Sequence, residues 1–174
     1  MSFFGSASSN EANPVVVLPP GAHRFAGGFL VGPAIRVGQD FCLCQGQSIF
    51  NDPDLASTAR DSGPAAAWQQ AFAQHGAMAP SHVSGRFAVL LVQPAAQRVF
   101  MATDRFATWP MCYAQDQGVL HVSHRADTVP LPGRRLSMQA LFDYLYHHCI
   151  PAPRTVFEGV LRLRAGHVDR KSVV

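Results

Sequence analysis

Four groups of residues in the 174-residue chain carry side chains that could do chemistry. Removal of the initiator Met would make Ser2 an N-terminal hydroxyl nucleophile, with its own α-amino group as base. Cys42 and Cys44 stand two positions apart, as metal-binding or redox-active pairs do. His147-His148-Cys149 gathers potential metal ligands, and Asp104-Arg105 has the composition of a catalytic pair. We favour a structural role over a chemical one for the last three groups.

Spacing is the reason for this preference. Alternate positions on a strand put Cys42 and Cys44 on one face, and no second Cys or His pair follows at zinc spacing, so core packing is favoured. Neighbouring residues on a helix do not converge on one ion, which argues against a metal site at residues 147–149. Asp104 and Arg105 at a strand end suit a buried ion pair or turn-fixing hydrogen bonds. Replacing Asp104 is therefore expected to cost stability more than activity.

We predict antiparallel strands as the elements that hold most of these residues in place. Residues 85–92 are apolar on both alternating faces, so this strand must be covered on two sides. Further strands are predicted at 99–103, 111–114 and 119–123, and their short connections can only join antiparallel neighbours. We interpret Gly85 and Gly118 as turn residues. Earlier in the chain we predict a strand at 15–18, two short strands within 25–44 and a turn at 51–54.

Two helices are predicted beside the strands. Pro64 suits the first position of one, and Gly76 ends it. Ser137 caps the other, where Leu136 and Leu141 form a hydrophobic staple. Its predicted buried stripe consists of Leu141, Phe142, Leu145 and Tyr146. The predicted aromatic core consists of Trp68, Phe72, Phe87 and Tyr113. Together the elements predict a layered α+β sandwich.

Composition limits the class of protein. With 48% hydrophobic and 14% charged residues the chain suits one folded domain and excludes general disorder. No apolar run is long enough for a membrane helix and no secretory signal begins the chain, so we expect a cytoplasmic protein with no membrane partner. The net charge is +3 and basic residues are not clustered, so no nucleic-acid partner is expected.

Several ordered blocks resemble one family. The blocks are Gly85-Arg86-Phe87-Ala88, residues 102–113, 122–126, 141–145 and 150–160, and Leu163-Arg164-Ala165-Gly166-His167. They resemble the N-terminal glutamine amidotransferase domain of the asparagine synthetase family, roughly over residues 62–167. The resemblance implies an N-terminal-nucleophile hydrolase fold: a four-layer αββα sandwich of two antiparallel sheets flanked by helices.

The same resemblance divides the chain. Residues 1–24 are expected to be an N-terminal segment with a first strand plus loop, and residues 25–167 the amidotransferase-like domain. Residues 168–174 complete no predicted element and hold the only lysine, so we interpret them as a truncated or aberrant tail. The synthetase domain that follows in the family is not contained in these residues.

Three positions depart from the family's chemistry. There an N-terminal cysteine attacks glutamine, an Asn-Gly pair supplies the oxyanion hole and an aspartate holds the substrate's amine. This chain has Ser2 for the cysteine, Gln45 before Gly46 for the asparagine, and Gly63 for the aspartate. Three changes at one pocket predict that it no longer hydrolyses glutamine.

The preferred interpretation is a non-catalytic domain of an asparagine-synthetase-like, ATP-dependent amide-forming enzyme. β-Lactam synthetases and lasso peptide cyclases are similar in lacking the cysteine. ATP and magnesium are expected only in the synthetase domain, so no cofactor is expected in this chain. The partners are the synthetase domain and, as a further arrangement, a second copy of the chain. Two alternatives remain open: an active glutaminase using Ser2, and a stand-alone interaction or dimerisation domain.

Overall fold

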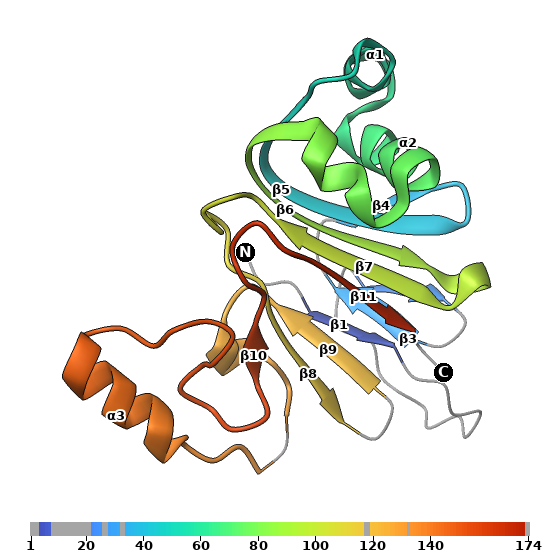
Figure 1. The fold of residues 1–174 in the computed structure, drawn as a ribbon. Helices are drawn as coiled ribbons and strands as arrows, with labels where there is room; N and C mark the ends of the chain where they lie inside the picture. Colours follow the sequence, from blue (N-terminus) through green and yellow to red (C-terminus); the bar gives the residue numbers. More distant parts are fainter. Residues whose placement is uncertain are drawn as a thin grey trace. The chain divides into compact units, whose positions relative to one another are not determined.

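The computed structural model describes residues 4–7, 22–25, 28–31, 34–116, 119–131 and 133–172. They form two compact units, each built on one antiparallel sheet (Figure 1). The predicted α+β class with two antiparallel sheets is therefore confirmed, while the stacking into four layers stays a prediction. Ser2, Gly118 and the strand expected at 15–18 lie outside the described residues.

The first unit comprises residues 1–32, 110–164 and 173–174. Its six-stranded sheet has the order β10-β8-β9-β1-β3-β2, and every neighbouring pair is antiparallel. The elements are β1 (Phe4–Ala7), β2 (Ala22–Phe25), β3 (Gly28–Val31), β8 (Cys112–Asp116), β9 (Val119–Ser123), the 3₁₀ turn η3 (Ala126–Thr128), α3 (Met138–His147) and β10 (Leu161–Arg162).

The second unit comprises residues 33–109 and 165–172. Its five-stranded antiparallel sheet has the order β11-β7-β6-β5-β4. The elements are β4 (Ile35–Val37), β5 (Asp40–Phe50), α1 (Pro53–Ser62), α2 (Pro64–His75), the 3₁₀ helices η1 (Gly76–His82) and η2 (Pro94–Ala96), β6 (Val83–Gln93), β7 (Arg98–Thr103) and β11 (Val168–Ser172).

The core of the second unit lies between α2 and the sheet. Trp68 is fully buried, and its indole N–H donates to the Ser48 hydroxyl of β5 at 3.0 Å. Its ring contacts those of Phe50, Phe72 and Phe87, at centroid distances of 5.5, 5.7 and 4.9 Å. This cluster confirms the predicted aromatic core apart from Tyr113, which is half-buried in the other unit.

Both faces of β6 are buried, as its sequence predicts. Phe87, Val89 and Leu91 belong to the cluster beneath α2. Ala88, Leu90 and Val92 alternate with them and are also buried. From Phe87 to Val92 the strand has no solvent side, which explains why this stretch is apolar throughout, whereas Ser84, Gly85 and Arg86 at its start are exposed.

Helix α2 begins at Pro64 and ends before Gly76, as predicted. The turn expected at 51–54 is instead the start of a helix, α1. The Asp52 side chain accepts hydrogen bonds from the backbone N–H groups of Asp54 and Leu55, at 2.8 and 3.4 Å, and Pro53 fills the first helical position. A capping aspartate followed by proline is a signal for a helix start as well as for a turn.

Three strand predictions need correction. The chain does not turn from β7 back to an adjacent strand, because β8 belongs to the sheet of the other unit. β5 does not end near Cys44 but continues through Gly46 to Phe50. The expected tail is not without structure, because residues 168–172 form β11, paired with β7.

The buried stripe predicted for α3 is wrong. Phe142, Leu145 and Tyr146 are exposed, and the buried residues of the helix are Ala140 and Asp143. Ser137 caps the helix as predicted, with its hydroxyl accepting from the Ala140 N–H at 3.2 Å. Leu136, the expected staple partner, is also exposed. The side of the helix that carries Ala140 and Asp143 faces its unit, where Asp143 pairs with Arg154 at 3.3 Å.

Among the described residues, no helix combines the length and the apolar character needed to cross a bilayer.

His121, on β9 of the first unit, is partly buried. Burial lowers the pKa of its imidazole, and nearby Asp116 raises it by a smaller amount. Its Nδ1 atom is buried and has no hydrogen-bond partner in the described structure. The folded state therefore holds this side chain in its neutral form.

Replacing Trp68 by Ala should lower the free energy of unfolding by about 3–5 kcal/mol, because a fully buried indole leaves a cavity. Urea unfolding followed by far-UV circular dichroism measures this without depending on tryptophan fluorescence. Met78→Ala is the matched control, since the exposed Met78 should change stability by no more than about 0.5 kcal/mol. Equal losses in the two variants would contradict the assignment of the core.

Stability should fall as the pH drops through about 6.5, the pKa of histidine in the unfolded chain. The unfolded state takes up the proton first, because the folded-state pKa of His121 is lower. His121→Gln removes this titration, so its urea midpoint should fall less than that of wild type between about pH 7.5 and 5.5. Met78→Ala, at an exposed position without a titratable group, should keep the wild-type pH dependence.

Candidate functional site

The candidate site lies where β5 and β6 pair in the second unit. Gln45 faces Ala88, Gly46 faces Phe87, and Ser48 faces Gly85 in the antiparallel register. Gly46 and Gly85 have φ angles of +88° and +98°, which side chains rarely adopt. The interpretation of Gly85 as a turn residue is wrong, because it lies inside β6.

Close backbone approach explains both glycines. A Cβ atom on Gly46 would lie 2.1 Å from the carbonyl oxygen of Arg86 and 2.5 Å from Nε1 of Trp109. A Cβ atom on Gly85 would lie 2.3 Å from the carbonyl oxygen of Gln47. Neither distance is compatible with a side chain. Gly46 therefore gives the Trp109 indole room to rest directly against the β5 backbone.

Gln45 carries a polar atom without a partner. Its side chain is partly buried, and Oε1 is buried with no hydrogen bond in the described structure. Ser48 points toward Trp68 of α2, so strand alternation puts Gln45 on the opposite face of the sheet. Leaving a buried amide oxygen unpaired typically costs about 1–3 kcal/mol.

Asp104 closes the turn that follows β7. Its carboxylate, 2% exposed, accepts from the backbone N–H groups of Phe87 (3.1 Å), Phe106 (2.8 Å) and Thr108 (3.1 Å), and from the Thr108 hydroxyl (3.2 Å). Its backbone N–H donates to the carbonyl of Phe87 at 2.9 Å. These are the turn-fixing hydrogen bonds that the sequence allowed for Asp104.

Arg105 takes no part in that network. It is exposed, and its guanidinium carbon lies 5.8 Å from the ring centroid of Phe106. No ion pair between Asp104 and Arg105 occurs in the described structure, so the ion-pair alternative does not hold. The same turn holds Ala107 at φ +49°. The asparagine synthetase family, which the sequence resembles, has glycine at this position. The Ala107 N–H donates to the Asp104 carbonyl at 3.0 Å, which stabilises this unfavourable conformation.

The structure brings some of the expected site residues together. Phe87 pairs with Gly46 on one side and bonds to Asp104 on the other, so these residues form one connected group with Gln45 and Gly85. Gly63 is separate: it joins α1 to α2 with φ +88°, and no contact between it and this group is described. Ser2 lies outside the described residues.

Trp109 was not predicted as a site residue. It is only 37% exposed although it follows an exposed turn, and its partner is a backbone rather than a side chain. A large aromatic residue just after a turn is the signal that could have drawn attention to it. Arg86 was also missed; it is exposed and lies directly opposite Gln47.

The cysteines do not add a metal site. Cys42 belongs to the cluster beneath α2, and the partly buried Cys44 packs against the same cluster. Their mutual hydrogen bond raises the pKa of the Cys42 thiol and lowers the pKa of the Cys44 thiol. His147, His148 and Cys149 are exposed. No group of three or more His, Cys, Asp or Glu side chains that could hold a metal ion occurs in the described part of the chain.

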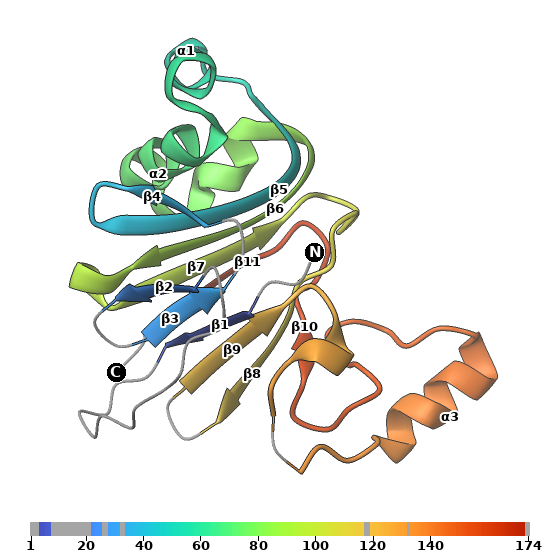
Figure 2. The same ribbon diagram turned by 180° about the vertical axis from the view of Figure 1, so that it is seen from behind.

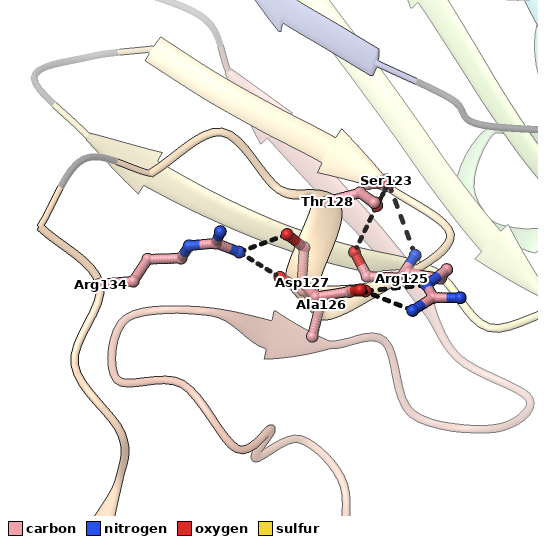
Figure 3. Close-up of polar contacts among 6 residues, drawn as sticks. All are labelled: Ser123, Arg125, Ala126, Asp127, Thr128 and Arg134. Atoms are coloured by element: carbon pink, nitrogen blue, oxygen red, sulfur yellow. Dashed lines mark hydrogen bonds and ion pairs between the residues drawn. The ribbon is translucent and has the colours of Figure 1, made fainter.

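A second polar network follows β9 in the first unit (Figure 3). Ser123 and Thr128 hydroxyls lie 2.6 Å apart, and the Arg134 guanidinium donates to the carbonyls of Ala126 and Asp127 at 3.1 and 2.6 Å. The Arg125 guanidinium binds the Asp127 carboxylate and lowers its pKa. These contacts fix the loop between β9 and α3 and leave no free carboxylate for acid–base chemistry there.

The family assignment follows from comparison with known sequences. The glutamine amidotransferase domain family matches residues 57–173, well over half of the chain. The match includes β6, the Asp104 turn and β11, while β5, with Gln45 and Gly46, precedes the matched residues. The chain therefore belongs to the glutamine amidotransferase domain family. No curated protein matched the sequence.

Solved structures include two similar chains. One is the glutamine phosphoribosylpyrophosphate amidotransferase from B. subtilis complexed with ADP and GMP, with 9% identity over 86% of this chain and a TM-score of 0.42. The other is described as the allosteric regulatory enzyme of purine biosynthesis, with 8% identity over 99% of this chain and a TM-score of 0.44. The present chain spans 35% and 43% of their lengths.

Replacing Asp104 by Asn should lower the free energy of unfolding by about 2–3 kcal/mol, because the amide N–H₂ would face backbone donors. Asp61→Asn is the matched control, since Asp61 is exposed on α1 and should change stability by no more than about 0.5 kcal/mol. Chemical unfolding followed by circular dichroism measures both. Similar small effects in both variants would show that the turn does not need the carboxylate.

Proposed function

We propose that this glutamine amidotransferase domain does not hydrolyse glutamine and instead accompanies an asparagine-synthetase-like enzyme that forms amides with ATP. The observation that carries the proposal is Gln45. It occupies the position where the resemblance implies the oxyanion-hole asparagine, and no described residue donates a hydrogen bond to its buried Oε1.

An oxyanion hole needs N–H donors held at one fixed point, and losing one donor typically costs about 10²- to 10³-fold in rate. Gln45 is one methylene longer than asparagine, which moves the amide and adds a rotatable bond. Gly46 is the implied second donor, and the Trp109 indole rests against its backbone. Both features oppose the binding of a tetrahedral intermediate at this place.

The residues at the positions implied for the nucleophile and for binding the substrate amine also argue against glutamine hydrolysis. Gly63 offers no carboxylate to a substrate ammonium group. Ser2 would supply a hydroxyl, which is a weaker nucleophile than the thiolate of the family. Loss of all three groups is more readily explained by a change of role than by separate replacement of each.

The partner follows from the family that the sequence resembles. There the amidotransferase-like domain works beside a synthetase domain that activates a carboxylate with ATP and magnesium. A member without glutaminase activity would leave the supply of the attacking amine to another source, such as an amine within the substrate. The contribution of this chain would then be to pack against the synthetase domain and complete it.

Purified protein incubated with glutamine should release no more glutamate than the Ser2→Ala variant, because the longer Gln45 side chain displaces the amide donor of the oxyanion hole. A coupled glutamate assay, with a glutamine-hydrolysing member of the family as positive control, measures the rate.

Glutamate release that requires Ser2 would contradict the proposal and establish the alternative, an active glutaminase with a serine nucleophile. In that case Gln45→Ala should reduce the rate about 10²-fold or more, since Gln45 would be acting as the donor. Met78→Ala serves as the unrelated surface control in both assays.

A further inference from the structure

Helix α3 presents its apolar side to solvent. Met138, Phe142, Leu145 and Tyr146 are 74%, 60%, 77% and 72% exposed. In both views of the first unit the helix stands apart from strands β8 and β9, at the end of long loops (Figures 1 and 2). The largest exposed apolar patch of a protein is often a functional surface, so these residues mark a candidate interaction site.

Polar contacts, not apolar packing, attach α3 to its unit. The Ser137 N–H donates to the Val156 carbonyl at 2.9 Å, and Arg154 pairs with Asp143 at 3.3 Å. Only Ala140 and Asp143 of the helix are buried. A helix of 10 residues is marginal in water on its own, so these contacts alone give it little stability.

The four exposed residues form one continuous stripe, which we call the α3 face. Phe142, Leu145 and Tyr146 follow Met138 at i+4, i+7 and i+8, on the side of the helix opposite Ala140 and Asp143. The Phe142 and Tyr146 rings are stacked, with centroids 6.1 Å apart and planes 10° from parallel. The two aromatic side chains thus lie together on the exposed side of the helix.

Charge does not oppose contact between two such faces. No residue of the α3 face is ionisable at neutral pH. Two pairs of charged groups in the same unit neutralise each other: Asp143 pairs with Arg154, and Arg135 pairs with Glu158 at 2.9 Å. An uncharged apolar stripe is complementary to itself.

We propose that the α3 face binds a second copy of the chain in a two-fold symmetric helix pair. The four side chains together expose on the order of 500 Å² per copy, taking 150–250 Å² as the usual size of a large side chain. Two copies would bury about 1,000 Å² through these side chains alone, which reaches the lower limit for a specific interface.

The oligomeric state of the purified chain tests the proposal. Sedimentation velocity and light scattering from about 1 to 200 μM should show a concentration-dependent dimer of twice 18.8 kDa, with a Kd in the micromolar range. Leu145→Glu should weaken the dimer at least about 100-fold, because pairing would bury two unpaired carboxylates. Leu145 is exposed in the single chain, so the monomer should keep its far-UV circular dichroism spectrum.

Tyr144→Glu is the matched control. Tyr144 lies on the same helix and is also exposed, but it is off the α3 face, so its replacement should change Kd by less than about threefold. Wild-type protein that stays monomeric over the whole range would overturn the proposal and leave the α3 face to a different protein domain. A dimer weakened equally by both substitutions would also overturn it, since the contact would then not be specific to this face.

Discussion

The hydrogen bonds of the Asp104 carboxylate join parts of the second unit that are distant in sequence. The carboxylate accepts hydrogen bonds from the Phe87 N–H of β6 and from the N–H groups of Phe106 and Thr108 in the turn after β7. The Asp104 carbonyl also accepts from the Gly166 N–H at 2.8 Å, just before β11. A buried carboxylate is stable only when its oxygens have donors, so all these segments must keep their places together.

The candidate site depends on this constraint. The Asp104 turn fixes where the chain leaves β7, and Trp109 comes just after that turn and rests against Gly46. Ala107, in a left-handed conformation, shows that the turn is stable enough to hold an unfavourable residue. Gln45 precedes Gly46 on β5, so the residue that carries the unpaired amide oxygen adjoins the backbone against which Trp109 lies. The Asp104 turn and the candidate site are therefore linked through Trp109.

The sequence predicted those elements whose signals are local. Helix α2 follows from Pro64 and Gly76, and β6 follows from its unbroken apolar run. The length of β5 was missed because Gly46, usually a strand breaker, is required inside this strand by the approach of Arg86 and Trp109. Such an approach is a tertiary contact and leaves no local pattern. The family motif identified Gln45 and Gly46, but nothing in the sequence indicated that Trp109 would lie over them.

Helix α3 shows what an amphipathic pattern does and does not determine. Its cap and its apolar spacing correctly predicted a helix from Met138, and the stripe was expected to face the core of its own unit. Asp143 instead turns inward, because its pairing with Arg154 compensates its partial desolvation. The apolar side must then face outward, since a helix cannot turn both sides to one surface. Apolar spacing thus indicates that a face will be buried, while ion pairs such as this one decide whether the covering surface belongs to the same folded unit.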